Sequence, residues 1–588
     1  MKRTIRVNSK ASYTIPKPIL ELKKLKNSYR SLWQSTRANI YKNLMNNTNN
    51  RLRRRILELK SINWNSLCET FTASSDNPIK MWNKIHNIDG SKSKKIILLP
   101  GINITEEEKS EVFADHFSKV FSNSTNSTFK SSTSDLLNED SNCPPISLFE
   151  LESNLKLINK RSCPGLDHIT GKMLMNLPFD CLQSLLIMFN YSLKHCILPQ
   201  AWKDSRIILL PKKDSNPNEP GFYRPISLTS CIVKLLEKII MTRLTSFVES
   251  NNILTQFQSG FREKRSTHDN LIRITHDIKH GFLTNKKTCL VLFDVEKAFD
   301  KCCHIKLIEA MIRLKIPIHF VKWIKAFLSD RKFMISVGNN LSAPKPITAG
   351  TPQGSLLSPI LFALFINDIA NIVLDSPVKI ALFADDVAIW FSHVNKNVIK
   401  SNIQPIIDCI HDFCAKNNLK LNVKKTSYTI FTKNGYRVDY LRNSTMELKI
   451  GTDIIARELN PRLLGIIFDP GLNFKKHLIE KCNKNINLIR VLSHYGKGIS
   501  KANLVKVYNA YIRSLFNYSF IPFTVVSASI KKELQIIQNN ALRYITGLYK
   551  SFHTKISYLH YLCNMPLVND IVNKALNNYM KKSQTTIY

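Results

Sequence analysis

The chain has 588 residues, 44% of them hydrophobic, which is enough for about three or four domains with cores of their own. Its formal net charge of +40 favours a polyanionic partner, nucleic acid first and an anionic membrane surface second, although an AT-rich genome would raise the lysine content without any function. The longest strong apolar run, 359–366, is shorter than the roughly 20 residues of a membrane span, and thirteen cysteines without a CxxC pair indicate reduced thiols of an intracellular protein.

The first 121 residues predict a basic, helical N-terminal extension. Its densest group of charges is an arginine cluster formed by Arg51, Arg53, Arg54 and Arg55. Thr105 and Glu108 have the capping-box spacing of a helix start, and apolar residues recur on one side of the helix that follows. Residues 122–145 are dense in Ser, Thr and Asn, which predicts a linker or a mobile loop.

From about residue 146 the pattern alternates between apolar helices and short strands, which is typical of a mixed helix and sheet fold. The expected helices are 147–159, 181–195, 232–248 and 304–314, and the expected strands are 206–210 and 289–293. Ser358 and Pro359 predict a further helix start, with Ser358 as the N-cap and Pro359 in the first helical position. Beyond residue 470 the chain predicts mainly basic amphipathic helices.

Two adjacent carboxylates, Asp385 and Asp386, stand between the apolar runs 380–383 and 387–391. Two apolar strands joined by a short turn predict a β-hairpin with both aspartates at its tip. Asp-Asp is a poor choice for such a turn, because both central residues tend to need positive φ, and a locally unfavourable choice indicates function. On this segment alone, a solvated acidic turn is an equally good interpretation.

A second acidic position, Asp294, ends the apolar strand predicted at 289–293. Such an aspartate is either a structural cap for the next turn or a metal ligand on a rigid element. Together with the hairpin pair, it would supply the carboxylates that two-metal phosphoryl transfer requires, since Mg²⁺ prefers oxygen ligands and uses one or two carboxylates with substrate phosphates.

Three motifs occur together in a fixed order. They are Phe293-Asp294 with Ala298-Phe299-Asp300, then Gly350-Thr-Pro-Gln-Gly-Ser355 leading to Ser358-Pro359, then Phe383-Ala-Asp-Asp386. In this order and spacing the chain resembles the reverse transcriptases of non-LTR (LINE-type) retrotransposons, particularly the jockey-like elements of arthropods, most strongly from about 160 to 475.

The resemblance implies an α+β right-hand polymerase fold with fingers, a palm containing an antiparallel sheet, and a thumb. The expected divisions are a basic helical extension (1–121), a polar linker (122–145), fingers and palm (146–475), and a helical thumb with the C-terminal region (476–588).

The resemblance also implies a metal site. Asp294 and Asp385 would be the main catalytic ligands of two Mg²⁺ ions, with Mn²⁺ as an alternative. Asp386 would support them, and the backbone carbonyl of Val295 would also face a metal. Phe299 would be a steric gate that crowds a ribose 2′-hydroxyl and favours dNTPs, or else simply a core phenylalanine.

The nucleotide-binding residues follow from the same resemblance. Gln353 and Gly354 would lie in the loop beneath the incoming nucleotide. Lys212 and Arg224 would hold the triphosphate, with Lys213 as an alternative to Lys212. Lys425, a better match than Lys424, would protonate the pyrophosphate, or else be a solvated surface lysine.

The remaining matches concern the template and primer. The segment containing Gln258, Gly260, Phe261 and Arg262 is expected near the template strand. Gly465 belongs to the expected primer-grip region.

The resemblance therefore implies an RNA-directed DNA polymerase that extends a DNA 3′-hydroxyl on an RNA template. Its partners would be the RNA template, a DNA primer or target and dNTPs, with no membrane; the oligomeric state stays open. We expect nuclear localisation, or a cytoplasmic ribonucleoprotein. Nothing before residue 160 has the pattern of the endonuclease usual in this family, so a non-catalytic nucleic-acid-binding relic of a truncated element is the alternative function. A maturase or a telomerase-type enzyme is a third interpretation.

Overall fold

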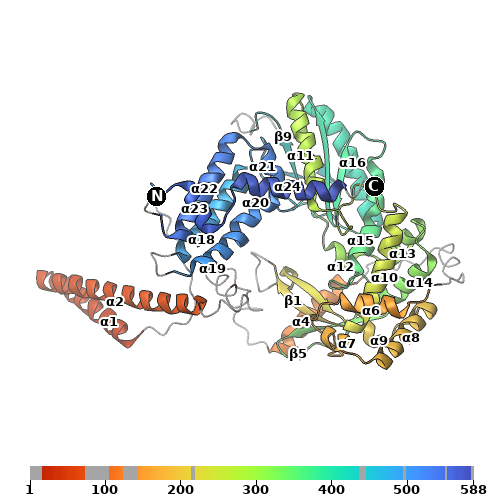
Figure 1. Ribbon diagram of the computed structural model, residues 1–588, viewed down its shortest axis with the longest axis horizontal. Coiled ribbons are helices and arrows are strands. Elements are labelled where there is room, and N and C mark those ends of the chain that lie inside the picture. The colour runs from red at the N-terminus through yellow and green to blue at the C-terminus, as the bar shows by residue number, and fades with distance from the viewer. Residues whose placement is uncertain are drawn as a thin grey trace. The chain divides into compact units, whose positions relative to one another are not determined.

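The structure is a computed structural model that describes residues 16–72, 82, 105–122, 143–212, 219–435, 445–493, 498–549 and 553–584. The chain divides into two compact units (Figure 1). One comprises Met1–Ser93 with Phe474–Lys581, and the other comprises Lys94–Asn473 with Lys582–Tyr588. Among the described residues, no helix combines the length and the apolar character needed to cross a membrane.

The larger unit contains a five-stranded sheet in the order β12-β9-β3-β8-β7. Its strands are β3 (Lys287–Phe293), β7 (Lys379–Phe383), β8 (Asp386–His393), β9 (Ser427–Phe431) and β12 (Ala456–Arg457). All neighbours pair antiparallel except β12, which runs parallel to β9. Helices α11 (Thr267–Leu283) and α16 (Lys396–Lys416) pack against this sheet (Figure 1). Cys289, Val291 and Phe293 alternate along β3 and enter the main hydrophobic core, as the period of a strand requires.

A second sheet in the same unit has the order β2-β1-β4-β5, with β6 also paired to β4. Its strands are β1 (Ser205–Pro211), β2 (Tyr223–Leu228), β4 (Arg331–Val337), β5 (Asn340–Leu341) and β6 (Lys345–Ile347). Helix α4 (Glu106–Val120) packs on β4, and Phe113 and Phe117 share a core with Ile207 and Phe333. The predicted capping box is confirmed, because Thr105 and Glu108 bond reciprocally.

Helices fill the space around the main core. They are α6 (Leu148–Lys156), α7 (Gly171–Met175), α8 (Phe179–His195), α9 (Gln200–Lys203), α10 (Cys231–Ser250), α12 (Ala298–Lys301), α13 (His304–Arg313), α14 (Ile318–Leu328) and α15 (Ser358–Ile366). Two 3₁₀ segments, Pro220–Phe222 and Asn367–Val373, complete the set. The predicted cap of α15 was off by one residue: Leu357 is the N-cap, while the hydroxyl of Ser358 donates to the Pro352 carbonyl.

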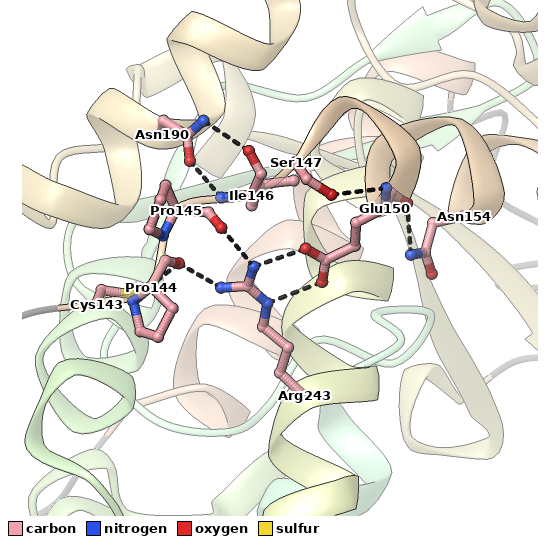
Figure 2. Close-up of polar contacts among 9 residues, drawn as sticks. All are labelled: Cys143, Pro144, Pro145, Ile146, Ser147, Glu150, Asn154, Asn190 and Arg243. Carbon is pink, nitrogen blue, oxygen red and sulfur yellow. Dashed lines mark hydrogen bonds and ion pairs between the residues drawn. The ribbon is translucent and has the colours of Figure 1, made fainter.

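Arg243 on α10 anchors the segment that leads into α6 (Figure 2). Its guanidinium makes a bidentate pair with Glu150, at 2.8 and 2.6 Å, and donates to the carbonyls of Pro144 and Pro145. The side chain of Asn190 holds both backbone groups of Ile146, and the Ser147 hydroxyl caps α6. One arginine thus fixes where the chain re-enters the core after residues 123–142, and the predicted linker lies almost wholly outside the described residues.

The other unit is helical. Helices α1 (Lys17–Thr36) and α2 (Asn39–Thr72) pack on each other as a hairpin. The C-terminal helices are α18 (Lys481–Leu492), α19 (Lys501–Tyr508), α20 (Ser514–Tyr518), α21 (Phe520–Val525), α22 (Ala528–Thr546), α23 (Ile556–Cys563) and α24 (Val568–Gln584), with π-helical turns at Lys476–Glu480 and Asn509–Arg513. Short hairpins also occur in the larger unit at β10 (Lys449–Ile450) with β11 (Asp453–Ile454) and at β13 (Arg462–Leu463) with β14 (Ile466–Ile467).

Candidate active site

Neighbouring strands bring the predicted carboxylates to one end of the five-stranded sheet. In the register of β3 and β8, Phe293 lies opposite Val387. Asp294 therefore follows β3 at the level of Asp386, beside the turn between β7 and β8. Backbone hydrogen bonding across antiparallel strands fixes this neighbourhood, so the carboxylates sit on rigid elements.

The hairpin turn differs from the prediction by one residue. Phe383 pairs with Asp386, so the two central residues are Ala384 and Asp385, and Asp386 is the first residue of β8. Ala384 takes the left-handed conformation with φ 57°, which disfavours any residue with a Cβ. An alanine in this conformation needs support from surrounding structure.

The backbone around Asp294 is held by the segment that follows α16. The carbonyl of Asp294 accepts from the Asn422 amide at 2.8 Å, and its own amide donates to the Thr426 hydroxyl. The bridge between Val295 and Leu421 uses only the flanking backbone groups, so the Val295 carbonyl faces away from that segment.

A cavity of about 780 Å³ collects most of the predicted site residues. Its lining includes Lys212, Arg224, Asp294, Val295, Phe299, Gln353, Gly354, Asp385 and Lys425. Asp386 instead lines a second cavity of about 370 Å³, together with Asp294, Lys424 and Lys425. The two adjacent aspartates thus face different spaces, whereas Asp294 and Lys425 border both.

The electrostatics of the carboxylates reflect their crowding. Burial and the nearby Asp294 carboxylate raise the pKa of Asp385. Burial, then the neighbouring Asp385 and Asp294, raise the pKa of Asp386 to about 6. Lys425 offsets part of this negative charge, because its ammonium lies 3.6 Å from a carboxylate oxygen of Asp294.

Cations also line the 780 Å³ cavity. Lys212 directly follows β1, and Arg224 lies on its partner strand β2. The Lys212 ammonium donates to the Gly221 carbonyl. Burial, with Lys425, Lys297 and Arg224 nearby, lowers the pKa of Lys212. A phosphate-bearing ligand would relieve this repulsion between like charges. Lys213, the alternative to Lys212, lies outside the described residues.

The loop containing Gln353 is fastened on both sides. The Gln353 side-chain amide donates to Asp300 at 2.7 Å, and its backbone carbonyl accepts from the Ser227 amide. Gly354 has φ 123°, and a Cβ there would lie 2.5 Å from the Ser227 carbonyl oxygen, so only glycine fits. Asp300 was not among the predicted site residues, although it belongs to the Ala298-Phe299-Asp300 motif. Burial raises its pKa to about 6.

Glu237 on α10 holds the next part of the same loop and was also missed. It is fully buried, and one of its oxygens accepts from the Ser355 hydroxyl at 2.5 Å and from the Leu356 amide at 2.7 Å. Burial raises its pKa, while these donors and the buried Arg331 act in the opposite direction. The sequence feature that could have identified Glu237 is its charge on the apolar face of the predicted helix 232–248.

The aromatic residues form a short series. The ring of Phe299 packs 4.5 Å from that of Phe362, centroid to centroid, and Phe261 meets Phe299 edge-to-face at 6.1 Å. Phe299 therefore both lines the cavity and contacts the core, so its two interpretations are compatible. Phe261 is half exposed, with its backbone in the left-handed region.

The other residues expected near template or primer lie outside the 780 Å³ cavity. Gln258 is 1% exposed. Arg262 makes a bidentate pair with Glu249 and donates to the Thr255 carbonyl, so its guanidinium is engaged within the protein. Gly465 stands in the turn between β13 and β14 with φ 83°. The structure therefore buries Gln258 and gives Arg262 internal partners.

The carboxylates suit a divalent cation by their chemistry. Among the described residues, no three His, Cys, Asp or Glu side chains form a group that could hold a metal by themselves. Mg²⁺ does not require such a cage, because it commonly takes one or two carboxylates and completes its shell with water and substrate phosphates. Crowded carboxylates with raised pKa values beside an open cavity fit this pattern.

Comparisons with known proteins give a consistent family. The model of the reverse transcriptase (RNA-dependent DNA polymerase) family matches residues 210–468. The chain is 26% identical over 554 residues to the probable RNA-directed DNA polymerase from transposon BS of Drosophila melanogaster. That match covers 91% of this chain and 60% of the relative. The chain is also 26% identical over 449 residues to the RNA-directed DNA polymerase from mobile element jockey of the same species, covering 74% and 48%.

A third relative is the probable RNA-directed DNA polymerase from transposon X-element of Drosophila melanogaster, 26% identical over 582 residues. That match covers 96% of this chain and 63% of the relative. The chain thus spans between 48% and 63% of the length of these three proteins. The family match runs from the end of β1, just before Lys212, to the hairpin that carries Gly465.

Proposed function

Because this chain belongs to the reverse transcriptase family, with jockey-like non-LTR elements among its relatives, we propose that it is an RNA-directed DNA polymerase. It extends a DNA 3′-hydroxyl along an RNA template with dNTPs. The observation that carries the proposal is the 780 Å³ cavity, which is lined by Asp294 and Asp385 and also by Lys212, Arg224 and Lys425. Two-metal nucleotidyl transfer needs both carboxylates and phosphate-binding cations in one space.

In this proposal Asp294 and Asp385 would hold two divalent cations, Mg²⁺ or alternatively Mn²⁺. When bound, the cations would neutralise charge on the attacking 3′-oxygen and on the departing pyrophosphate oxygen. Asp386 acts from the neighbouring cavity by keeping the local field negative. Val295 lines the same cavity as Asp294 and Asp385, and its backbone carbonyl would be a further oxygen ligand.

The remaining residues bind and orient the nucleotide. Lys212 and Arg224 hold the triphosphate, and Lys425 donates a proton to the leaving pyrophosphate. The fixed Gln353–Gly354 loop forms a floor for the base, and the Phe299 ring, supported by Phe362, crowds the ribose 2′ position. The sheet with Asp294 and Asp385 would be the palm, the sheet with β1 and β2 the fingers, and the C-terminal helices the thumb.

The test is primer extension. Purified protein with Mg²⁺ should lengthen a DNA primer annealed to RNA, and Asp385→Ala should abolish extension while RNA binding persists. Unchanged extension by Asp385→Ala would overturn the assignment of the site. Wild-type protein that binds RNA but incorporates no nucleotide would instead favour the non-catalytic relic.

A further inference from the structure

The turn that presents Asp385 is supported by a segment distant in sequence. Residues 257–259 add to the edge of β7 as a short parallel bridge, in which Leu382 donates to the Phe257 carbonyl and accepts from the Ser259 amide, both at 3.0 Å. The side-chain amide of Asn270 on α11 also donates to the Leu382 carbonyl, at 2.8 Å. The strand that leads into the turn is therefore fixed from outside the hairpin.

Gln258 extends this support into the turn itself. Its side-chain oxygen accepts from the Ala384 amide at 3.1 Å and from the Gly260 amide at 2.8 Å. Because both partners are N–H donors, the oxygen must face them, which fixes the orientation of the amide. Its nitrogen is buried and has no hydrogen-bond partner among the described atoms. The two bonds to the side-chain oxygen are therefore formed at the cost of one buried, unpaired donor.

The close approach depends on a glycine. A Cβ at Gly260 would lie 2.4 Å from the Ala384 amide nitrogen and 3.0 Å from the Phe383 carbonyl carbon. Real side chains do not tolerate such distances, so any other residue would displace the turn. Ala384 is itself in the strained left-handed conformation, and its amide is the group that Gln258 holds.

We propose that Gln258, with Gly260, is a positioning residue for Asp385: it holds the Ala384 amide, fixes the hairpin turn, and does not contact the template. The effect on catalysis rests on the proposed function, whereas the claim that Gln258 fixes the hairpin turn does not. A displacement of a reacting group by about 1 Å can lower a rate about 100-fold. Loss of the Gln258 oxygen should therefore slow the chemical step and leave the binding of substrates unchanged.

The experiment compares Gln258→Leu and Gln258→Glu with Gln256→Leu as the matched control. Gln256 lies two residues earlier in the same segment and is exposed. In Gln258→Leu we expect the single-turnover rate of incorporation to fall about 100-fold, with template affinity and the dNTP concentration for half-maximal rate each within about twofold. Gln258→Glu keeps an acceptor oxygen, so its single-turnover rate should be at least tenfold higher than that of Gln258→Leu. Gln256→Leu should behave as wild type.

Hydrogen exchange of the Ala384 amide provides a readout that does not depend on activity. In the full wild-type chain this amide should exchange slowly, and Gln258→Leu should accelerate it at least tenfold, while Gln256→Leu should not. Fast exchange in the wild type would overturn the proposal. So would a Gln258→Leu variant that binds template more weakly but incorporates nucleotide at the wild-type rate. If the wild type shows slow exchange but no polymerisation, the proposed function fails and the positioning role stands. If Gln258→Leu does not fold, the wild-type exchange and Gln258→Glu still decide the outcome.

Discussion

The cavity at the carboxylates and the helical hairpin of α1 and α2 use charge in opposite ways. In the cavity region, buried carboxylates are fixed by hydrogen-bond partners, as Asp300 is by Gln353 and Glu237 by Ser355. On the α1–α2 hairpin, residues 17–59 contain eleven lysines and arginines and two glutamates, and the ion pair between Arg55 and Glu58 is exposed.

The difference matters because buried and exposed charges have different energetics. Charges in a desolvated, preorganised site act strongly on a transition state, since no reorganisation is needed when the reaction occurs. Exposed charges contribute little individually and are screened by salt, yet together they attract a polyanion. Substitutions in the cavity should therefore change rates strongly, and substitutions on the hairpin should change affinity weakly and in a salt-dependent way.

The largest expected effect separates two adjacent residues. Asp385→Asn removes a charge that faces the 780 Å³ cavity, and incorporation should fall by about 1,000-fold or more. Asp386→Asn removes a charge that faces the other cavity, and the fall should be about tenfold. Single-turnover primer extension at saturating dNTP measures both.

The control is Asp375→Asn, which makes the same chemical change at an exposed residue outside the site. Equal losses in Asp385→Asn and Asp386→Asn would show that the two cavities do not divide the roles of the pair. A greater loss in Asp386→Asn would reverse the ranking.

The intermediate effect concerns pH and the buried Asp300. Its pKa is raised to about 6, so the folded state binds a proton more tightly than the unfolded state. The resulting stabilisation is present below about pH 4 and is lost as the pH rises through about 6. The free energy of unfolding of the wild type should therefore fall, relative to Asp300→Asn, by about 2–3 kcal/mol between pH 4 and pH 7.

Denaturant unfolding without divalent cations measures this difference. Asparagine keeps an acceptor for the Gln353 amide, so the hydrogen bond of 2.7 Å can persist in the variant. Asp375→Asn again serves as the control and should run parallel to the wild type. Parallel curves for Asp300→Asn and the wild type would show that Asp300 titrates as an ordinary carboxylate.

The sequence predicted regular elements well, because their signals are local. The expected helix at 232–248 is α10, and the expected strand at 289–293 lies within β3. The β-hairpin of β7 and β8 was also predicted, but the prediction placed its turn one residue too late in the sequence. Turn rules ask for glycine or asparagine at positive φ, and Ala384 takes that conformation with Gln258 holding its amide.

Long-range partners explain what the sequence did not reveal. Gln258 bonds to Ala384, 126 residues away, and Glu237 bonds to Ser355, 118 residues away. No local pattern contains such pairs, so Gln258 was expected near the template from its motif alone, and Glu237 received no role. Most of the predicted residues that line the cavity belong to motifs with recognisable chemistry, although Asp300 in the same lining was missed. Gln258 and Glu237 fix those motifs through hydrogen bonds that no motif records.

The smallest expected effect lies on the basic hairpin. Changing Arg51, Arg53, Arg54 and Arg55 together to glutamine removes four exposed charges from α2. RNA affinity should fall about tenfold at low salt, and the slope of log affinity against log salt should become shallower by roughly 0.7–0.9 for each lost phosphate contact. The incorporation rate at saturating template should not change, because none of the four lines the cavity.

The matched control changes four exposed, uncharged residues of the same helix to glutamine: Asn43, Asn46, Asn47 and Asn50. Titrations of fluorescent RNA at several salt concentrations compare the two variants with the wild type. If the arginine variant keeps the wild-type slope, the cluster contacts no phosphate, and its charge is a solvated surface. If it instead loses incorporation at saturating template, exposed charge in α2 acts on the rate, and the contrast between cavity and hairpin does not hold.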